Sequence, residues 1–503
     1  MISAHLTVDP HFVVGPINRR IFGSFVEHLG RCVYDGLYEP GHPQADEHGF
    51  RRDVIELVKE LGVSTIRYPG GNFVSGYRWE DGVGPRDQRP RRLDLAWHST
   101  ETNEIGLDEF AIWLREVGSE LMYAVNLGTR GIQEALDVLE YANIRSGTEL
   151  SDRRIANGAV EPYGIRMWCL GNEMDGPWQL GHGTALEYGR LAVKTARAMR
   201  QIDPTLELVA CGSSSAQMPT FAEWERTVLE ETYDEVDYIS CHAYYEPVGD
   251  DYGSFLASAV NMDRFIDSVV ATADHVKALR GSDKTMNISF DEWNVWYQSR
   301  YAEVDRITDA EHWPIAPRLL EDVYSVIDAV VFGNLLISLL RHADRVTSAS
   351  LAQLVNVIAP IMTEPGGPAW RQTTFFPFAV TSRLARGVTL ELKLDCPTYE
   401  TERYGLVPVV DAVATHDEAT GEAAIFLVNR SHDEEVEIVV DTSILGDVGI
   451  TSADTLWDED IHATNTMQDP ERVGLRPNTS ARIADGALRL TLPPVSWTAV
   501  SLR

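Results

Sequence analysis

Short apolar segments alternate with longer amphipathic segments from about residue 20 to residue 355. The short segments have the length and composition of buried strands, whereas in the longer ones apolar residues recur every three or four positions, as on one face of a helix. Strands separated by helices imply right-handed crossovers and a parallel sheet. The predicted strands are 21–26, 64–68, 121–127, 165–170, 207–211, 238–242, 286–290 and 348–353, and the predicted helices are 52–61, 108–117, 133–142, 184–201, 221–229, 262–279 and 321–340. This number of strands favours a (β/α)8 TIM barrel over an open doubly wound sheet.

The pattern changes after about residue 384. Segments 423–429, 435–440, 487–492 and 495–502 alternate or run apolar between clusters of Gly, Asp, Asn and Pro, which predicts an all-β, jelly-roll-like sandwich. Segment 3–8 also alternates, and we expect it to add a strand to this sandwich. The predicted organisation of this α/β chain is therefore residues 1–15, an N-terminal strand joining the sandwich, residues 16–383, the barrel, and residues 384–503, the sandwich.

Composition narrows the class of protein. A chain of 503 residues suggests about three domains, but a barrel of this length reduces the expectation to two. Hydrophobic residues at 44% and charged residues at 24% are ordinary globular values and exclude disorder as the main state. The formal net charge of −33 repels phosphate backbones and anionic lipid, which argues against nucleic acid or a membrane surface as a partner.

Two further features predict a cytoplasmic protein. The five cysteines are an odd number without a CxxC pair, which is typical of buried thiols rather than a disulfide framework. The first residues lack the basic region and apolar core of a secretory signal. The longest mostly apolar stretch, residues 329–340, is too short to span a bilayer.

Polar side chains follow the predicted barrel strands at one rim. A barrel carries its active site at the C-terminal ends of its strands, so these positions are candidate functional residues. Scattered structural polar groups would show no preference for one rim. The residues at or directly after the strand ends are Glu27, Arg67, Asn126, Glu173, His242, Glu292 and Gln353.

Glu173 and Glu292, after the fourth and seventh strands, suggest glycoside hydrolysis. This reaction needs two carboxyl groups, one to protonate the leaving oxygen and one to attack the sugar or activate water. Aromatic rings stack well on the C–H surfaces of sugars, and four tryptophans lie near these glutamates in sequence, namely Trp168, Trp178, Trp293 and Trp296. Hydrogen bonds to sugar hydroxyls can come from Asn172, Asn126, Gln353, Tyr244 and Arg67.

Each of these residues also has a structural interpretation. A single strand-end glutamate can cap a helix or form an ion pair, but the pair beside tryptophans favours catalysis. Asp291 is expected on the opposite side of its strand from Glu292, orienting neighbours or pairing with a barrel cation. Without an HxH or HExxH spacing, His242 is expected to be a hydrogen-bonded site residue rather than a metal ligand. Arg67 is expected to pair with a carboxylate such as Glu292.

The chain resembles the α-L-arabinofuranosidases of glycoside hydrolase family 51. The resemblance is carried by Arg-Tyr-Pro-Gly-Gly-Asn at 67–72, Gly-Asn-Glu at 171–173, Asp-Glu-Trp-Asn at 291–294 and Leu-Ala-Gln-Leu-Val-Asn at 351–356. These motifs occur in the family's order, and the similarity extends over essentially the whole chain. The family fold implied is a (β/α)8 barrel with a β-sandwich, commonly in hexamers, and neither a metal nor a cofactor is expected.

The resemblance implies roles for individual residues. Glu173 matches the general acid/base and Glu292 the nucleophile of a retaining double displacement. The positions that match residues holding the arabinofuranose are Glu27, Asn72, Asn172, Tyr244 and Gln353, those that match carboxylate support are Arg67 and His242, and those that match aromatic residues near the sugar are Trp97 and Trp296. Asn126, at the third strand end, is expected to support the site. Segment 298–314 and Trp97 lie where such enzymes vary.

The function expected is release of terminal arabinofuranose from arabino-oligosaccharides derived from arabinan or arabinoxylan. Another barrel glycosidase of the same clan, a β-xylosidase or an endo-β-glycanase, is the alternative. A barrel metallohydrolase and a non-catalytic sugar-binding protein are alternatives from other classes. The chain lacks the paired-histidine motif of a metallohydrolase, and the intact pair Glu173 and Glu292 argues against a non-catalytic protein.

Overall fold

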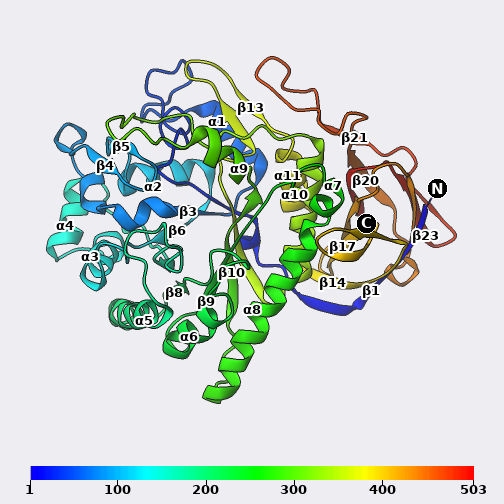
Figure 1. Cartoon of the computed structure of the whole chain (residues 1–503), viewed down its shortest axis with the longest axis horizontal. Helices are drawn as coiled ribbons and strands as arrows, with labels where there is room; N and C mark the ends of the chain where they lie inside the picture. The colour runs from blue at the N-terminus through cyan, green and yellow to red at the C-terminus, as the bar shows by residue number, and fades with distance from the viewer. Residues whose placement is uncertain (1) are drawn as a thin grey trace.

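The computed structural model describes residues 2–503 and contains a closed parallel β-barrel beside a second, β-rich unit (Figure 1). The barrel closes in the order β10-β11-β2-β3-β6-β7-β8-β9, so neighbouring strands are also neighbours along the chain. The predicted barrel is confirmed. Its strands are β2 (Gly23–Phe25), β3 (Thr65–Tyr68), β6 (Glu120–Ala124), β7 (Met167–Leu170), β8 (Glu207–Ala210), β9 (Tyr238–Tyr245), β10 (Asn287–Val295) and β11 (Val346–Leu351).

Helices connect the strands and cover the outside of the barrel. They are α1 (Arg52–Leu61), α2 (Leu107–Val117), α3 (Ile132–Asn143), α4 (Glu149–Ala156), α5 (Ala185–Ile202), α6 (Glu223–Thr232), α7 (Tyr252–Leu256), α8 (Ser258–Arg280), α9 (Gln298–Arg300), α10 (Val326–Arg341) and α11 (Phe375–Leu384). Helix α1 illustrates the local rules. It buries one apolar face and ends at Gly62, whose left-handed φ of 77° lets its N–H bond to the carbonyl of Val58.

The β-rich unit is a ten-stranded sheet that folds over its own core. The strand order is β21-β20-β24-β18-β17-β14-β1-β19-β23-β22, and β23 and β24, far apart in this order, contribute to one apolar cluster. The strands are β1 (Ile2–Pro16), β14 (Val388–Asp395), β17 (Val410–Asp417), β18 (Glu422–Asn429), β19 (Val436–Asp441), β20 (Ile450–Leu456), β21 (Leu475–Pro477), β22 (Arg482–Ala484), β23 (Ala487–Leu492) and β24 (Ser496–Leu502). Strand β1 pairs with β14 and β19 and so brings the start of the chain into this sheet.

Three two-stranded sheets complete the fold. They pair β4 (Arg92–Asp94) with β5 (Ser99–Glu101), β12 (Ile361–Thr363) with β13 (Ala369–Arg371), and β15 (Thr398–Thr401) with β16 (Gly405–Pro408). The β4–β5 hairpin belongs to the long connection from β3 to α2, so it lies at the C-terminal rim of the barrel. The β12–β13 hairpin follows β11 and lies at the same rim.

Helix α10 lies between the barrel and the ten-stranded sheet, and its residues from Val326 to Leu340 are buried. Gly333 lets the indole of Trp497 in β24 approach the helix, because a Cβ there would overlap the ring. Asn334 donates a hydrogen bond of 2.7 Å to Asp411. The apolar stretch 329–340 is therefore an interdomain helix, and between residues 2 and 503 no helix combines the length and apolar character needed to cross a membrane.

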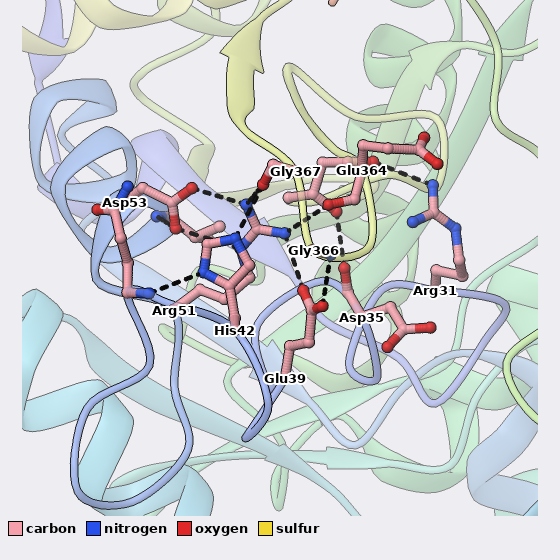
Figure 2. Close-up of polar contacts among 12 residues, drawn as sticks. Arg31, Asp35, Glu39, His42, Arg51, Asp53, Glu364, Gly366 and Gly367 are labelled. Carbon is pink, nitrogen blue, oxygen red and sulfur yellow. Dashed lines mark hydrogen bonds and ion pairs between the residues drawn. The ribbon is translucent and has the colours of Figure 1, made fainter.

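Arg51 fastens the turn of the β12–β13 hairpin to the N-terminal part of the barrel (Figure 2). Its guanidinium donates to the backbone carbonyls of Glu364 at 3.0 Å and Gly367 at 2.7 Å. It also forms ion pairs with Glu39 at 3.0 Å and Asp53 at 2.7 Å, and it is fully buried. This one side chain therefore lies between two carboxylates and two turn carbonyls, and His42 also contacts the carbonyl of Gly367, at 2.9 Å.

Replacing Arg51 with methionine should destabilise the protein by about 3 kcal/mol, because it removes the buried cation that pairs with Glu39 and Asp53. Unfolding followed by circular dichroism in urea measures this. Arg52→Met is the matched control, since Arg52 is exposed and reaches Glu47 only at 3.5 Å. Equal effects of the two substitutions would contradict the assignment.

Candidate active site

The predicted site residues gather at the C-terminal mouth of the barrel. Strands β9 and β10 continue past their apolar cores to Tyr245 and Val295, so His242, Tyr244 and Glu292 are held within strands rather than loops. Glu173 follows β7 with a left-handed φ of 45°. Glu173, His242 and Glu292 are buried and Tyr244 is half-buried, although each is polar or ionisable. A cluster of buried polar groups at this rim is the expected position of a barrel active site.

Glu292 is held by two donors. The guanidinium of Arg67 donates from Nη1 to Oε1 at 2.9 Å, and the hydroxyl of Tyr244 donates to Oε2 at 2.7 Å. Gly71 lies close to the same carboxylate, because a Cβ built there would be 3.2 Å from Oε1. The carboxylate is thus fixed in orientation, with little room beside it for a larger residue at position 71.

Glu173 is held by a histidine and a tryptophan. Nδ1 of His242 lies 2.9 Å from Oε1, and the indole N–H of Trp178 donates to Oε2 at 2.8 Å. Nδ1 of His242 is also 3.5 Å from Oε2 of Glu292. One carboxylate oxygen of each glutamate and this nitrogen all lie within 4.8 Å of one another. The two carboxylates therefore face the same small space.

The charges of the two glutamates act on His242. Burial alone lowers its pKa, but the charges of Glu292 and Glu173 and the hydrogen bond to Glu173 outweigh burial and raise the pKa above its usual value. In the described chain, Glu173, His242 and Glu292 form the one group whose ligand atoms converge closely enough to hold a metal ion. Their observed partners are one another, Arg67, Tyr244 and Trp178.

Arg67 connects the catalytic strands to the amides of the site. Its Nη2 donates to Oδ1 of Asn172 at 2.6 Å, and the amide of Asn172 donates to Oδ1 of Asn72 at 3.2 Å. The guanidinium also lies 4.9 Å from the centre of the Phe25 ring. Arg67 therefore orients Glu292 and Asn172 together, and through Asn172 it orients Asn72.

Asp291 also pairs with Arg67, and its Oδ2 lies 3.8 Å from Nε of the guanidinium. The strand β10 has an irregular register between Ser289 and Glu292, where three steps along β10 match two along β9. This extra residue is a bulge, and it lets consecutive residues Asp291 and Glu292 both reach Arg67, which a regular strand would not allow. Burial raises the pKa of Asp291, while the charge of Arg67 opposes the increase.

Glu27 forms a second anchor in the site. Its Oε1 accepts hydrogen bonds of 2.9 Å from both the backbone N–H of Phe73 and the indole of Trp97, and its Oε2 accepts one of 3.0 Å from Gln353. Burial raises the pKa of Glu27 to about 8, against these hydrogen bonds. Gly70, with a φ of 147°, leaves space for this side chain, because a Cβ there would collide with it.

Aromatic rings form one wall of the site. Trp296 packs edge-on against Tyr244 with ring centres 4.9 Å apart. Tyr301 bridges Trp296 and Trp97, at 6.0 Å and 5.9 Å from their ring centres. The sequence did not single out Tyr301, because it lies in a helical turn, Tyr301–Asp305, that is too short to show periodicity or a motif. The donor role of Trp178 toward Glu173 was also missed, since a side-chain direction in a loop leaves no pattern.

Asn126 has a different position from the other predicted residues. Its amide donates to the backbone carbonyl of Tyr77 and to Thr129, and its Oδ1 accepts from the N–H groups of Gly128 and Thr129. The side chain therefore fixes the turn after β6. Its hydrogen bonds with described residues go to this turn and its neighbour, and none goes to the two glutamates.

Comparisons with known proteins identify the family. The model of the α-L-arabinofuranosidase 1 domain matches residues 57–265, and that of the α-L-arabinofuranosidase C-terminal domain matches residues 291–496. An exo-α-(1→6)-L-arabinofuranosidase of Bifidobacterium longum is 61% identical over 100% of this chain and 97% of its own length. An intracellular exo-α-(1→5)-L-arabinofuranosidase of Streptomyces lividans is 60% identical over 99% of this chain and 75% of its own length.

A solved structure has the same fold over the full length. The family 51 α-L-arabinofuranosidase AbfB of Bifidobacterium longum superposes with a TM-score of 0.96 at 49% identity, covering 100% of both chains. With two family models covering most of the chain and close relatives aligned from end to end, the chain belongs to the α-L-arabinofuranosidases of glycoside hydrolase family 51.

Proposed function

We propose that this protein is an exo-acting, retaining α-L-arabinofuranosidase. The observation that carries the proposal is the convergence of Glu173 and Glu292 on one space, with an oxygen of each within 4.8 Å of the other. Retaining glycosidases hold their two carboxyl groups about 5–5.5 Å apart, whereas inverting enzymes need about 6.5–9.5 Å to admit water between them. The short separation supports direct attack on the sugar by a carboxylate.

The reaction proceeds in two displacements. Glu292 attacks the anomeric carbon while Glu173 gives its proton to the departing glycosidic oxygen, which breaks the bond and leaves a covalent arabinosyl ester on Glu292. Glu173, now a carboxylate, takes a proton from water as that water attacks the anomeric carbon. The ester bond breaks, arabinose leaves with its original configuration, and both glutamates return to their starting states.

The neighbouring residues position the groups that react. Tyr244 and Arg67 hold the two oxygens of Glu292, so its attacking orbital is aligned before substrate binds. His242 and Trp178 do the same for Glu173. Hydrogen bonding and stacking of the arabinofuranose are proposed for Glu27, Asn72, Asn172, Gln353, Trp97 and Trp296.

The names of the relatives bear on substrate and location. Two relatives of nearly equal identity are named for (1→6) and (1→5) linkages, and several are named intracellular. We propose a cytoplasmic enzyme acting on arabino-oligosaccharides derived from arabinan or arabinoxylan. The names favour this activity over the β-xylosidase or endo-β-glycanase alternative, because relatives at 50–61% identity are all named arabinofuranosidases.

We further propose that the chemistry is confined to residues 16–383, with residues 1–15 and 384–503 as the supporting unit. For the assembly we propose a homohexamer. Light scattering after size exclusion should give six times the chain mass of 56.1 kDa. A monomeric or dimeric mass at micromolar concentration would overturn the proposed hexamer while leaving the catalytic assignment unaffected.

Glu292→Ala should lower kcat on an aryl α-L-arabinofuranoside by about 10⁴-fold or more, because no group remains to form the ester. Azide added to this variant should replace the carboxylate and give the inverted β-arabinosyl azide. In Glu173→Ala the ester still forms from an activated aryl substrate, and azide should attack it to give the α-arabinosyl azide. NMR of the products reports the configuration. Near-wild-type turnover by either variant, or a β-azide from Glu173→Ala, would contradict the roles.

Tyr244→Phe should lower kcat/KM about 100-fold, because Glu292 loses the hydroxyl that orients one of its oxygens. The adjacent Tyr245→Phe is the matched control, since Tyr245 is a buried tyrosine of the same strand and donates to Asn261 at 3.2 Å instead. Steady-state kinetics on the aryl arabinofuranoside and thermal melts of both variants measure the difference. A comparable kinetic loss in Tyr245→Phe would show that Tyr244 acts through general strand packing.

A further inference from the structure

His28 is a buried side chain that the proposed chemistry does not use. It directly follows Glu27 in the chain, and both of its ring nitrogens have partners. Nδ1 lies 2.9 Å from Oε2 of Glu101, and Nε2 lies 2.8 Å from the hydroxyl of Tyr68. An ionised carboxylate only accepts hydrogen bonds, so Nδ1 carries the proton that is shared with Glu101. His28 and Glu101 therefore form a buried pair in which the imidazole donates and the carboxylate accepts.

Glu101 stays ionised although it is buried. Its other oxygen, Oε1, accepts hydrogen bonds from the hydroxyl of Tyr34 and from the backbone N–H of Asn103, the latter at 2.6 Å. Burial raises the pKa of Glu101, but the charge of His28 and these hydrogen bonds outweigh burial and lower the pKa below its usual value. Both oxygens have donors, so the carboxylate is fixed in position as well as in charge.

The pair connects the elements that hold Glu27. His28 follows β2, and Glu101 ends β5, the second strand of the hairpin whose turn carries Trp97. The His28 ring also stacks on Phe73, with ring centres 4.8 Å apart and planes inclined by 19°. The backbone N–H of Phe73 and the indole of Trp97 both donate to Oε1 of Glu27 at 2.9 Å. The imidazole thus contacts one of these donors directly and reaches the hairpin of the other through Glu101.

Strand β5 has two kinds of attachment. The N–H and the hydroxyl of Thr100 donate to the carbonyls of Pro314 at 2.9 Å and Trp313 at 2.8 Å, in a partly exposed connection after β10. Glu101 instead reaches His28 at the barrel rim, where the His28 side chain has no exposed surface and that of Glu101 is 7% exposed. A hydrogen bond to a charged group is stronger than one between neutral groups, and burial keeps water from screening it. The contact with His28 is therefore the stronger attachment of the hairpin.

We propose that His28 and Glu101 are positioning residues for arabinofuranose binding. They hold in place the indole and the backbone N–H that donate to Glu27 before substrate arrives. This inference rests on the proposed function, because Glu27 holds the sugar only if the protein acts on arabinofuranosides. A donor set that is already ordered does not have to be ordered on binding, so the pair raises the affinity for the sugar. The two glutamates proposed for catalysis keep their own partners when the pair is broken, so the chemical step changes little.

The first test breaks the pair at Glu101. Glu101→Ala removes the acceptor of His28, and we expect KM for an aryl α-L-arabinofuranoside and the inhibition constant of arabinose to rise about tenfold, with kcat within about twofold of wild type. In Glu101→Gln the amide oxygen still accepts from the N–H of Asn103, while the amide nitrogen donates to Nδ1 of His28, whose other nitrogen then carries the proton. This variant should recover most of the affinity. Equal losses in the two variants, measured by steady-state kinetics with arabinose as inhibitor, would overturn the positioning role.

A double-mutant cycle with Trp97 tests whether Glu101 acts through the sugar site. Trp97→Phe alone removes the indole donor to Glu27 and should also raise the inhibition constant of arabinose. Once that donor is gone, adding Glu101→Ala should raise the constant by less than about threefold, because the hairpin no longer positions a donor. Losses that multiply as independent effects would overturn the proposal.

Asp108→Asn is the matched control, because it disturbs a comparable cluster of a carboxylate and tyrosines outside the site. Asp108 lies in α2 and accepts hydrogen bonds of 2.8 Å from Tyr141 and 2.6 Å from Tyr163. We expect a lower melting temperature but unchanged inhibition by arabinose. A rise in the inhibition constant as large as that of Glu101→Ala would show that any loss of stability weakens binding, and it would overturn the proposal.

The cycle remains decisive if one variant does not fold. In place of Glu101→Ala it then uses His28→Gln, whose longer amide keeps the contact with Tyr68 and loses the donor to Glu101. With an active wild type, independent losses overturn this inference alone. A wild type that does not hydrolyse the aryl arabinofuranoside overturns the proposed function and this inference with it.

Discussion

The buried ion pair between Arg67 and Glu292 is the interaction on which the site depends. An isolated ionised carboxylate costs several kcal/mol or more to bury, and a buried cation costs a similar amount, so each is tolerated only with the other in place. Arg67 meets this requirement for Glu292 at 2.9 Å and shares its remaining charge with Asp291 at 3.8 Å. The same guanidinium fixes Asn172, so Arg67 orients both the proposed nucleophile, Glu292, and an amide proposed to hold the sugar. The aromatic wall and the second carboxylate are positioned around this pair.

The sequence predicts the barrel well because its strands are apolar runs whose composition differs sharply from their surroundings. The predicted strand ends are less accurate at the site, where polar residues interrupt the apolar runs. Strands β9 and β10 were expected to end at residues 242 and 290, but they continue to Tyr245 and Val295, and the added segments mix apolar residues with Tyr244 and Glu292. Helix α4 was missed because its buried face contains Ser151 and Arg154 rather than an apolar stripe. Propensity and periodicity describe the core, whereas the catalytic rim violates both.

The candidate site, too, is predicted from the sequence only in part. The strand-end rule brings the two glutamates, Arg67 and His242 to one rim, and distant residues meet there because the barrel closes. The rule does not predict the side of the strand to which each side chain points. A regular β10 would place Asp291 away from Glu292, and only the bulge allows both to reach Arg67. Tyr301 begins a single helical turn, Tyr301–Asp305, which is too short to show a periodic pattern, and it is recognised only by its packing on Trp97.

The ten-stranded sheet supports the site through packing against helix α10. Trp293, the residue after Glu292, is fully buried and packs on Phe332 of α10 with ring centres 4.8 Å apart. The next residue of α10, Gly333, accommodates Trp497 from the ten-stranded sheet. The strand that carries Glu292 is therefore backed by a continuous apolar contact running from barrel to helix to sheet. Since packed interiors yield little to displacement, this contact limits how far Glu292 can move away from Arg67. The β-rich unit is in this sense part of the catalytic scaffold.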